Sequence, residues 1–223
     1  MAKILGYLAG LILLACSILQ PASGWAVVPG RIDTFQDGTT QNWIVGATPS
    51  PAPPVNVPSG GPAGAGDAYL RLKATGTASG PGNRLSVINQ TQWAGNYPAA
   101  GINAITMWVN NQGSTNLNLR LLVGVATPPG FPPSDSAIST VPVFLPAGSG
   151  WTEVIFPITP DQLTTLAGSA VKALSNAAEL RILHNPNPTF PPPVIAAQLG
   201  VDNIKAVGRH PGPPFLPLLL LDQ

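Results

Sequence analysis

The sequence has little charge and a single cysteine. Charged side chains make up 9% of the 223 residues, about a third of the usual share. The chain has ten basic and nine acidic side chains, and nine basic ones remain when Lys3 near the start is set aside. The charges then balance, so no basic surface for nucleic acid or anionic membrane is expected. Cys16 is the only cysteine. A disulfide framework within the chain is therefore excluded, and packing must hold the fold together.

Catalytic patterns are also missing. The only glutamates are Glu153 and Glu179, which lie on separate predicted strands in no convincing pair for glycoside hydrolysis. The chain contains no G-x-S-x-G elbow, H-E-x-x-H helix or phosphate-binding loop. His184 is the one histidine that precedes the C-terminal tail, which contains His210, and a lone histidine is more often structural than catalytic. We therefore predict that the protein is not an enzyme.

The first residues, 1–26, have the three-part layout of a secretion signal. Lys3 precedes an uninterrupted apolar stretch over residues 4–19, which Gln20, Pro21 and small residues follow. This stretch is shorter than the roughly 20 residues that a membrane-spanning helix needs. We predict that the protein is exported and is either secreted or held at the cell surface. A retained membrane anchor is the alternative.

Both ends of the chain leave the final location open. Leu13, Leu14 and Ala15 before Cys16 resemble a bacterial lipobox, although leucine directly before the alanine is a poor fit. Cys16 would then carry a lipid, whereas the alternative treats it as a small hydrophobic residue of the signal. Residues 210–223 form a separate tail whose apolar run is too short to span a membrane. We predict that this tail is disordered or is a degenerate sorting signal.

The region between these ends, residues 27–209, is rich in turn-forming residues and still apolar. The chain has 24 glycines and 27 prolines, and its hydrophobic fraction of 44% is too high for a disordered protein. Short segments alternate apolar and polar residues, which is typical of half-buried strands. The clearest segments are residues 68–74, 83–88, 102–110, 116–125, 137–145, 151–158, 179–184 and 201–207, and weaker ones are 31–35 and 41–45.

One segment, residues 160–177, favours helix. Pro160 and Asp161 are suited to a helix start, and Gly168 is expected to divide the segment into two short turns. Otherwise short strands follow one another without helices between them. The pattern predicts one all-β domain, an antiparallel β-sandwich of about nine or ten strands. Proline-rich residues 47–67, 126–136 and 185–193 are expected to be surface loops, serving either as binding loops or as low-complexity insertions.

Four motifs are more specific than composition. They are DTFQDGTTQNW (33–43), TQWAGNYPAAGINAITMWVNN (91–111), ELRILHN (179–185) and GVDNI (200–204). Together they resemble the galactose-binding-like jelly-roll superfamily, particularly carbohydrate-binding modules with an F-E-x-G opening, a W-x-G-Y-x-G-I strand entry and a closing D-N-I. The resemblance covers most of residues 33–207 and implies a jelly-roll fold and sugar binding. The tail is similar to PEP-type sorting signals, without their Pro-Glu-Pro and terminal arginines.

The same resemblance implies one structural calcium ion. In such modules a calcium ion commonly joins the first and last strands through acidic side chains and backbone carbonyls. The matching positions are Asp33 and Asp37 at the opening and Asp202 at the close. Gln36 stands where the family usually has glutamate, which removes one hard anionic ligand. The alternative is that Asp33 and Asp37 serve a turn and that Asp202 caps a loop.

Candidate ligand-binding residues follow from the alternation of the strands, because successive side chains point to opposite faces. The face opposite the apolar one combines aromatic rings with planar polar groups, as sugar recognition requires. Its members are Tyr69, Arg71, Trp108, Asn118, Arg120 and Arg181. The alternative is that this is an ordinary polar outer face, with arginines that hold loops. Trp43, Trp93, Tyr97 and Trp151 are expected to fill the ends of the core instead.

The sequence therefore predicts an exported, non-catalytic module that binds glycan or cell-wall polysaccharide. A structural or adhesive surface protein without sugar binding is the alternative function. The sequence does not identify the sugar, and it does not give the strand order or the oligomeric state.

Overall fold

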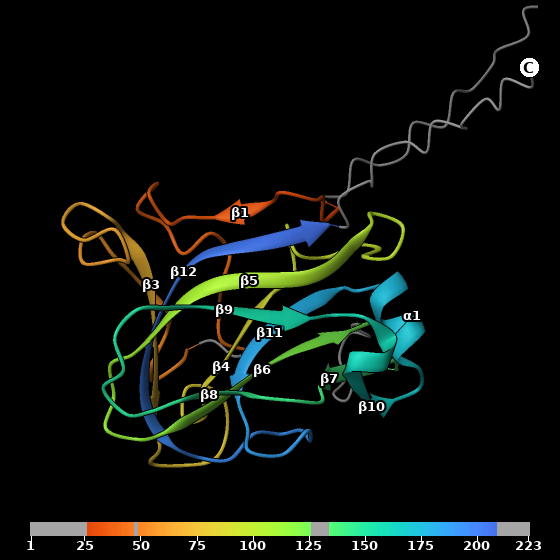
Figure 1. Cartoon of the computed structure of the whole chain (residues 1–223). Helices are drawn as coiled ribbons and strands as arrows, with labels where there is room; N and C mark the ends of the chain where they lie inside the picture. The colour runs from red at the N-terminus through yellow and green to blue at the C-terminus, as the bar shows by residue number, and fades with distance from the viewer. Residues whose placement is uncertain (1–25, 47–48, 126–133, 209–223) are drawn as a thin grey trace, which may run out of the picture.

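The structure, a computed structural model, describes residues 26–46, 49–125 and 134–208. The predicted signal peptide with Cys16, the tail after residue 209 and most of the proline-rich residues 126–136 lie outside this part of the chain. The described residues form two facing layers of strands (Figure 1). No helix among them is long and apolar enough to cross a membrane.

Each layer is a six-stranded antiparallel sheet. The first sheet has the order β2-β3-β12-β5-β9, and β1 also pairs with β12. Its strands are β1 (Ile32–Asp33), β2 (Val55–Val57), β3 (Tyr69–Thr75), β5 (Ile102–Asn111), β9 (Thr152–Pro157) and β12 (Ala196–Gly208). The second sheet has the order β10-β7-β6-β11-β4, and β8 also pairs with β6. Its strands are β4 (Ser86–Asn89), β6 (Leu117–Gly124), β7 (Ser136–Ser139), β8 (Val143–Leu145), β10 (Leu163–Ala167) and β11 (Glu179–His184). The predicted antiparallel sandwich is confirmed.

The core lies between the two sheets because alternate residues of their strands are apolar. Leu70 and Leu72 of β3 point inward, and so do Ile105, Met107 and Val109 of β5. Trp43 and Trp93 are fully buried in the same core, with their ring centroids 6.4 Å apart. The expectation that Trp43, Trp93 and Tyr97 fill the core is therefore confirmed.

A second, smaller apolar cluster covers the outer side of the second sheet. Leu122, Ile138 and Leu183 are fully buried, although they point away from the main core. Leu166 of β10 and Phe190 of the loop after β11 pack against them. This outer side is therefore covered by protein, whereas a simple two-layer sandwich would expose it to water.

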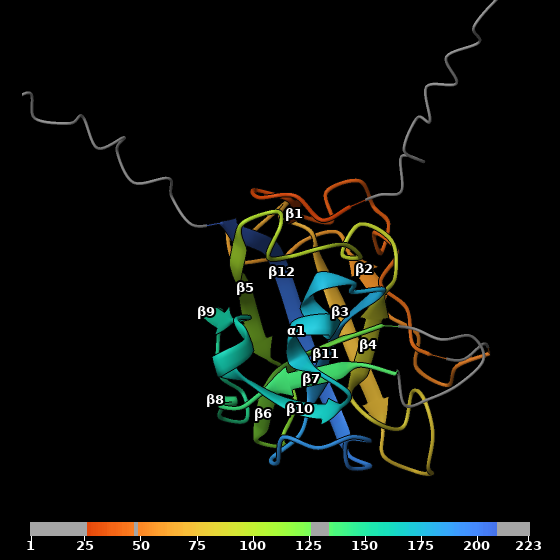
Figure 2. The ribbon, with the colours of Figure 1, turned by 90° about the vertical axis from the view of Figure 1, so that its right-hand side faces the viewer.

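The predicted helical segment is half wrong. Residues 160–162 form a 3-10 turn, Leu163–Ala167 is strand β10, and only α1 (Ala170–Ser175) is an α-helix. Gly168 lies between β10 and α1 with a φ of 57°, so it divides the segment as predicted. Two adjacent β-branched threonines follow Leu163, and β7 offers an edge with which β10 pairs. In the turned view, α1 lies beside β7 and β10 at one side of the sandwich (Figure 2).

Other differences have similar local causes. The predicted strand 137–145 is two strands, β7 and β8, separated by a turn that contains Pro142. The weak segment 41–45 forms only an isolated bridge from Ile44 to Ile88. Gln41 and Asn42 have φ values of 47° and 63° there, which extended strands do not adopt. The short strand β2 lies within a stretch that was expected to be loop.

Candidate ligand-binding face

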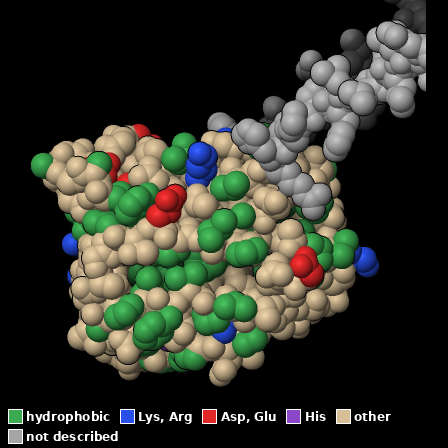
Figure 3. All heavy atoms as spheres, in the orientation of Figure 1, with side chains coloured by type: hydrophobic (Ala, Val, Ile, Leu, Met, Phe, Trp, Pro, Cys, Tyr) green, Lys and Arg blue, Asp and Glu red, His purple; other side chains and the backbone are tan. Residues whose placement is uncertain are grey.

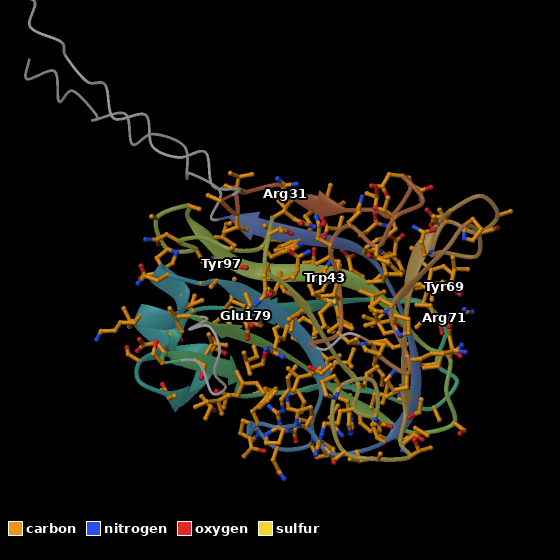
Figure 4. All side chains as sticks on the ribbon, turned by 180° about the vertical axis from the view of Figure 1, so that it is seen from behind. Arg31, Trp43, Tyr69, Arg71, Tyr97 and Glu179 are labelled. Carbon is orange, nitrogen blue, oxygen red and sulfur yellow. The ribbon has the colours of Figure 1, made fainter. Side chains whose placement is uncertain are left out.

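The six predicted ligand-binding residues lie on two opposite sides of the molecule. Tyr69 and Arg71 on β3 and Trp108 on β5 point outward from the first sheet. The other three, Asn118 and Arg120 on β6 and Arg181 on β11, point outward from the second sheet. In Figure 4, Tyr69 and Arg71 lie side by side and far from Glu179, which precedes Arg181 on β11. The expectation that all six share one site is therefore wrong.

Arg120 is a structural side chain. It is 2% exposed, and burial lowers the pKa of its guanidinium. Its nitrogens donate to the carbonyl oxygens of Asn185 at 2.8 Å and Pro186 at 2.7 Å, in the loop after β11. They also donate to the carbonyls of Ser139 and Thr140 at 2.6 and 2.7 Å. Arg120 thus fastens two loops to the second sheet. This agrees with the alternative that the outer arginines hold loops.

Arg181 and Asn118 share this covered side. The guanidinium of Arg181 pairs with the carboxylate of Glu179 through two bonds of 2.5 and 3.0 Å, and it lies 5.4 Å from the ring centre of Phe190. The backbone N–H of Asn118 donates to Nδ1 of His184 at 2.9 Å. Burial lowers the pKa of His184, which fits the predicted structural role of a neutral histidine. We call this side, with Asn118, Arg120, Leu122, Glu179, Arg181 and Leu183, the loop-covered face.

The outer side of the first sheet gathers aromatic rings. Tyr69 and Trp151 meet edge to face, with ring centroids 5.2 Å apart. Trp151 lies over Gly200 of β12, where an added Cβ would stand 2.9 Å from Cη2 of the indole. Its Nε1 donates to the carbonyl of Gly60 at 2.9 Å. Trp151 was expected to fill the core, and the structure corrects this: its ring lies half-buried at the surface.

Trp108 extends this aromatic surface along β5. Asn110 is the β5 partner of Gly200, and Trp108 is the next residue of β5 on the same side. Trp108 is half-buried and pairs with Glu153 of β9 on its other flank. Trp108 and Trp151 therefore lie on the same outer side of the first sheet, even though the residues are far apart in the sequence.

Polar groups border the rings. Nε2 of Gln198 donates to Oε1 of Gln112 at 2.9 Å, and Nε2 of Gln112 donates to the hydroxyl of Tyr69 at 3.0 Å. Arg71 lies on β3 opposite Gly200, and its Nε is buried without a hydrogen-bond partner among the described residues. We call this surface the aromatic face. It consists of Tyr69, Arg71, Trp108, Gln112, Trp151 and Gln198, of which the sequence identified Tyr69, Arg71 and Trp108.

The three predicted calcium ligands have separate surroundings. Asp33 is buried, and its Oδ2 accepts hydrogen bonds from Nε1 of Trp43 at 2.8 Å and Nε1 of Trp93 at 2.7 Å. Burial raises the pKa of Asp33, and these bonds oppose the shift. Asp37 is exposed and accepts from the backbone N–H of Thr39 at 2.9 Å, which lowers its pKa. Asp33 therefore anchors two indoles, and Asp37 serves its own turn.

Asp202 is the most unusual of the three acids. It is fully buried, and its Oδ1 has no partner in the described part of the chain. Its Oδ2 accepts from Nδ2 of Asn203 at 3.0 Å. Burial, together with the nearby charge of Asp67, raises the pKa of Asp202 to about 7. An unpaired carboxylate at this depth favours the neutral form.

The residues present do not fit the expected calcium site. Among the described residues, no group of three or more acidic, histidine or cysteine side chains is close enough to hold a metal ion. The carbonyl oxygens of Phe35 and Thr39 in the opening loop accept hydrogen bonds from Nδ2 of Asn56 at 2.7 and 2.9 Å. Gln36 donates to Asp67 at 2.7 Å instead of supplying a charge. Among these three acids, Asp202 alone has a buried carboxylate oxygen without a partner in the described residues, and the structure does not bring Asp33 and Asp37 into one cluster with it.

Comparison with known proteins supports the fold. No protein-family model matches the chain, and no curated protein matches its sequence. The family 11 carbohydrate-binding module from Clostridium thermocellum, in complex with a β-1,3-1,4-mixed-linked tetrasaccharide, has a similar structure. Its TM-score is 0.52 at 16% identity, and the match covers 82% of this chain and 98% of that one. The family 11 module of the cellulosomal cellulase Lic26A-Cel5E from the same organism has a TM-score of 0.52 at 13% identity, covering 82% and 96%.

A third structure extends the comparison to an enzyme. An exo-β-agarase matches with a TM-score of 0.57 at 11% identity, over 82% of this chain but only 26% of the agarase. All three identities are low, so the comparisons show the fold alone. The chain has the same β-sandwich fold as these modules, and the fold that the sequence resemblance implied is confirmed.

Proposed function

We propose that the protein is an exported, non-catalytic module that binds glycan on the aromatic face. The observation that carries the proposal is that the half-buried indoles of Trp108 and Trp151 lie on the same outer side of the first sheet, where the buried Tyr69 packs edge to face against Trp151. Aromatic rings provide flat apolar surfaces on which the C–H groups of a sugar pack. The described residues expose no comparable pair of rings on the loop-covered face, where Phe190 already packs against Leu122 and its neighbours.

Polar groups beside the rings supply the second half of sugar recognition. Nε of Arg71 is buried without a hydrogen-bond partner within the described residues, so the proposal assigns bonds with ring hydroxyls to the terminal nitrogens of this guanidinium. The amides of Gln112 and Gln198 are already oriented by their bonds to each other and to Tyr69. Preorganised groups lose little entropy when a ligand binds. The face therefore combines stacking surface with fixed hydrogen-bonding partners.

The two glutamates favour binding over catalysis. Glu153 lies on the outer side of the first sheet, opposite Trp108 in the ladder. Glu179 lies on the other outer side and is paired with Arg181. A glycosidase needs two carboxyl groups within about 10 Å across one cleft. Because these two side chains point away from each other through the whole sandwich, they support no hydrolytic site.

The proposal is tested by affinity electrophoresis of the purified protein through gels that contain mixed-linkage β-glucan, xylan or agarose. We expect at least one polysaccharide to retard the protein, and we expect Trp108→Ala to abolish the retardation. Phe144→Ala is the matched control, since Phe144 is 57% exposed on β8 of the second sheet. If none of the polysaccharides retards the protein, or if Trp108→Ala behaves like the wild type, the proposed site is refuted.

One observation favours a second candidate function, that of a structural or adhesive surface protein. Hydrophobic side chains gather on the side that faces the viewer in Figure 3, over β9 and β8. Val141 is 73% exposed, Phe144 57% and Ile155 58%, and exposed apolar patches often mark protein contacts. Sedimentation of the protein without sugar tests this function. Assembly that Ile155→Lys abolishes would support it, and a sugar-binding monomer would exclude it.

A further inference from the structure

A wide hollow of the described surface lies apart from the aromatic face. It has a volume of about 690 Å³ and is open to solvent between β1, the loop after it and residues 91–92. This volume lies within the usual range for ligand pockets. In Figure 4, Arg31 stands at the edge of the molecule above Trp43, which marks this end. None of the residues that line the hollow belongs to the aromatic face.

The backbone along this hollow is held in an unusual conformation. Gln41 and Asn42 both line it, and both have positive φ values, which are uncommon for residues other than glycine. The carbonyl of Gln41 accepts hydrogen bonds from Nδ2 of Asn89 at 2.9 Å and Nε2 of Gln92 at 2.6 Å. These bonds fix the conformation. Such fixed, strained segments are concentrated at binding sites.

Two opposite charges in the hollow are close but not joined. Oδ2 of Asp33 accepts three N–H groups, whereas its Oδ1 has no donor among the described residues. The charge of Arg31 is near enough to lower the pKa of Asp33, which burial raises. The structure nevertheless contains no ion pair between them, and Nε of Arg31 is buried without a partner in the described part of the chain. The hollow is thus lined by a carboxylate that three N–H groups hold in place and by an arginine with which it forms no ion pair.

We propose that this hollow is a second saccharide site, in which neighbouring hydroxyls of one sugar ring bridge Oδ1 of Asp33 and the guanidinium of Arg31. One hydroxyl would donate to the carboxylate, and the next would accept from the guanidinium. Thr40 and Gln41 supply further polar groups at the wall. The class of ligand rests on the proposed function, whereas the location rests on the hollow itself.

A second site would change how the protein holds a polymer. The hollow has no exposed aromatic ring, because Trp43 lies fully buried behind Asp33. It would therefore recognise hydroxyl geometry, whereas the aromatic face would supply stacking surface. Two separate sites on one small domain bind a polysaccharide by avidity or join two chains.

The indole N–H groups provide separate reporters for the two sites. Those of Trp43 and Trp93 bond to Asp33 at the hollow, that of Trp151 bonds to Gly60 at the aromatic face, and Trp108 lies on that face. We would titrate ¹⁵N-labelled protein with the β-1,3-1,4-linked glucotetraose and with the methyl glycosides of glucose, galactose and mannose. The hollow predicts saturable shifts at Trp43, Trp93 and the amides of Gln41 and Asn42 with at least one sugar.

Variants assign these shifts. We expect Arg31→Gln to weaken binding at the hollow about tenfold, the usual effect of losing a charged hydrogen bond. Thr40→Arg should block the hollow by its volume while it leaves Arg31 in place, and Arg71→Gln is the matched control on the aromatic face. Shifts confined to Trp108 and Trp151 would overturn the second site and leave the proposed function standing. A protein in which no indole shifts would contradict both.

Discussion

Arg71 and Arg120 show how two outward-pointing arginines of one sandwich come to differ. Each lies on a central part of a strand, and each alternates with leucines that point into the core. Arg120 is covered by the loop after β11, and four carbonyl oxygens occupy its donors. Arg71 lies opposite Gly200, over which the ring of Trp151 lies, and its Nε has no hydrogen-bond partner among the described residues. Coverage by a loop, rather than position on a strand, separates the structural arginine from the one available to a ligand.

The largest effect is expected from Arg120→Ala. This change leaves four carbonyl oxygens without a donor and frees two loops from the second sheet. We expect a loss of about 3 kcal/mol or more in the free energy of unfolding, since each buried group that loses its partner costs about 1–3 kcal/mol. Arg71→Ala should cost less than about 1 kcal/mol. Urea unfolding of both variants measures the contrast, and equal losses would contradict it.

The next effect concerns Asp202, which is fully buried although it lies beside Trp108 in the first sheet. The folded pKa of Asp202 is about 7, above its ordinary value of 3.8, because burial disfavours the charge. A raised pKa contributes stability at low pH that is lost as pH rises from about 4 through 7. The change is limited to about 1.4 kcal/mol per pH unit. We therefore expect the wild type to lose stability over this range.

Asp202→Asn isolates that contribution because asparagine stays neutral. In a chelator, the variant should show a smaller decline between pH 4 and 7 than the wild type when both are unfolded with urea. Parallel curves for the two proteins would show that Asp202 does not titrate as described. A wild-type curve that flattens when calcium is added would revive the calcium hypothesis at Asp202 alone.

A smaller effect is expected at Gly200, which determines where the ring of Trp151 lies. Any Cβ at this position stands 2.9 Å from Cη2 of the indole, so Gly200→Val must displace the ring. We expect roughly tenfold weaker glycan binding with less than about 1.5 kcal/mol of lost stability, in proportion to one disturbed stacking partner. Calorimetric titration measures the affinity, and thermal unfolding measures the stability. Unchanged affinity would remove Trp151 from the site.

The strand pattern of the sequence was sufficient to find most of this fold. Alternation in residues 68–74 and 102–110 correctly separated Leu70 and Ile105 from Tyr69 and Trp108. It failed for residues 163–167, where a helical pattern hid a strand that forms because β7 offers an edge. Local patterns define the two faces of each strand, but they contain no information on which long-range neighbour a strand will find.

The site was harder to predict for the same reason. Tyr69 and Arg120 share a pattern, but only the sheet order shows that they lie on opposite sides of the sandwich. Trp151 precedes its strand, so nothing local distinguished it from the buried Trp43 and Trp93. Gly200 was the one available clue, because a glycine within a long apolar strand often marks a close approach by another group. The calcium ligands were assigned from the family resemblance alone. In the structure, Asp33 instead accepts hydrogen bonds from the indoles of Trp43 and Trp93.

The central claim is that ligand binds to the aromatic face and not to the loop-covered one. Isothermal titration with the glycan that retards the wild type tests it most directly, by comparison of Trp108→Ala with Phe144→Ala. We expect the loss of Trp108 to weaken binding by about ten- to a hundredfold, while the loss of Phe144 leaves the affinity unchanged. Normal affinity in Trp108→Ala together with weakened binding in Phe144→Ala would place the ligand on the opposite side and contradict the account.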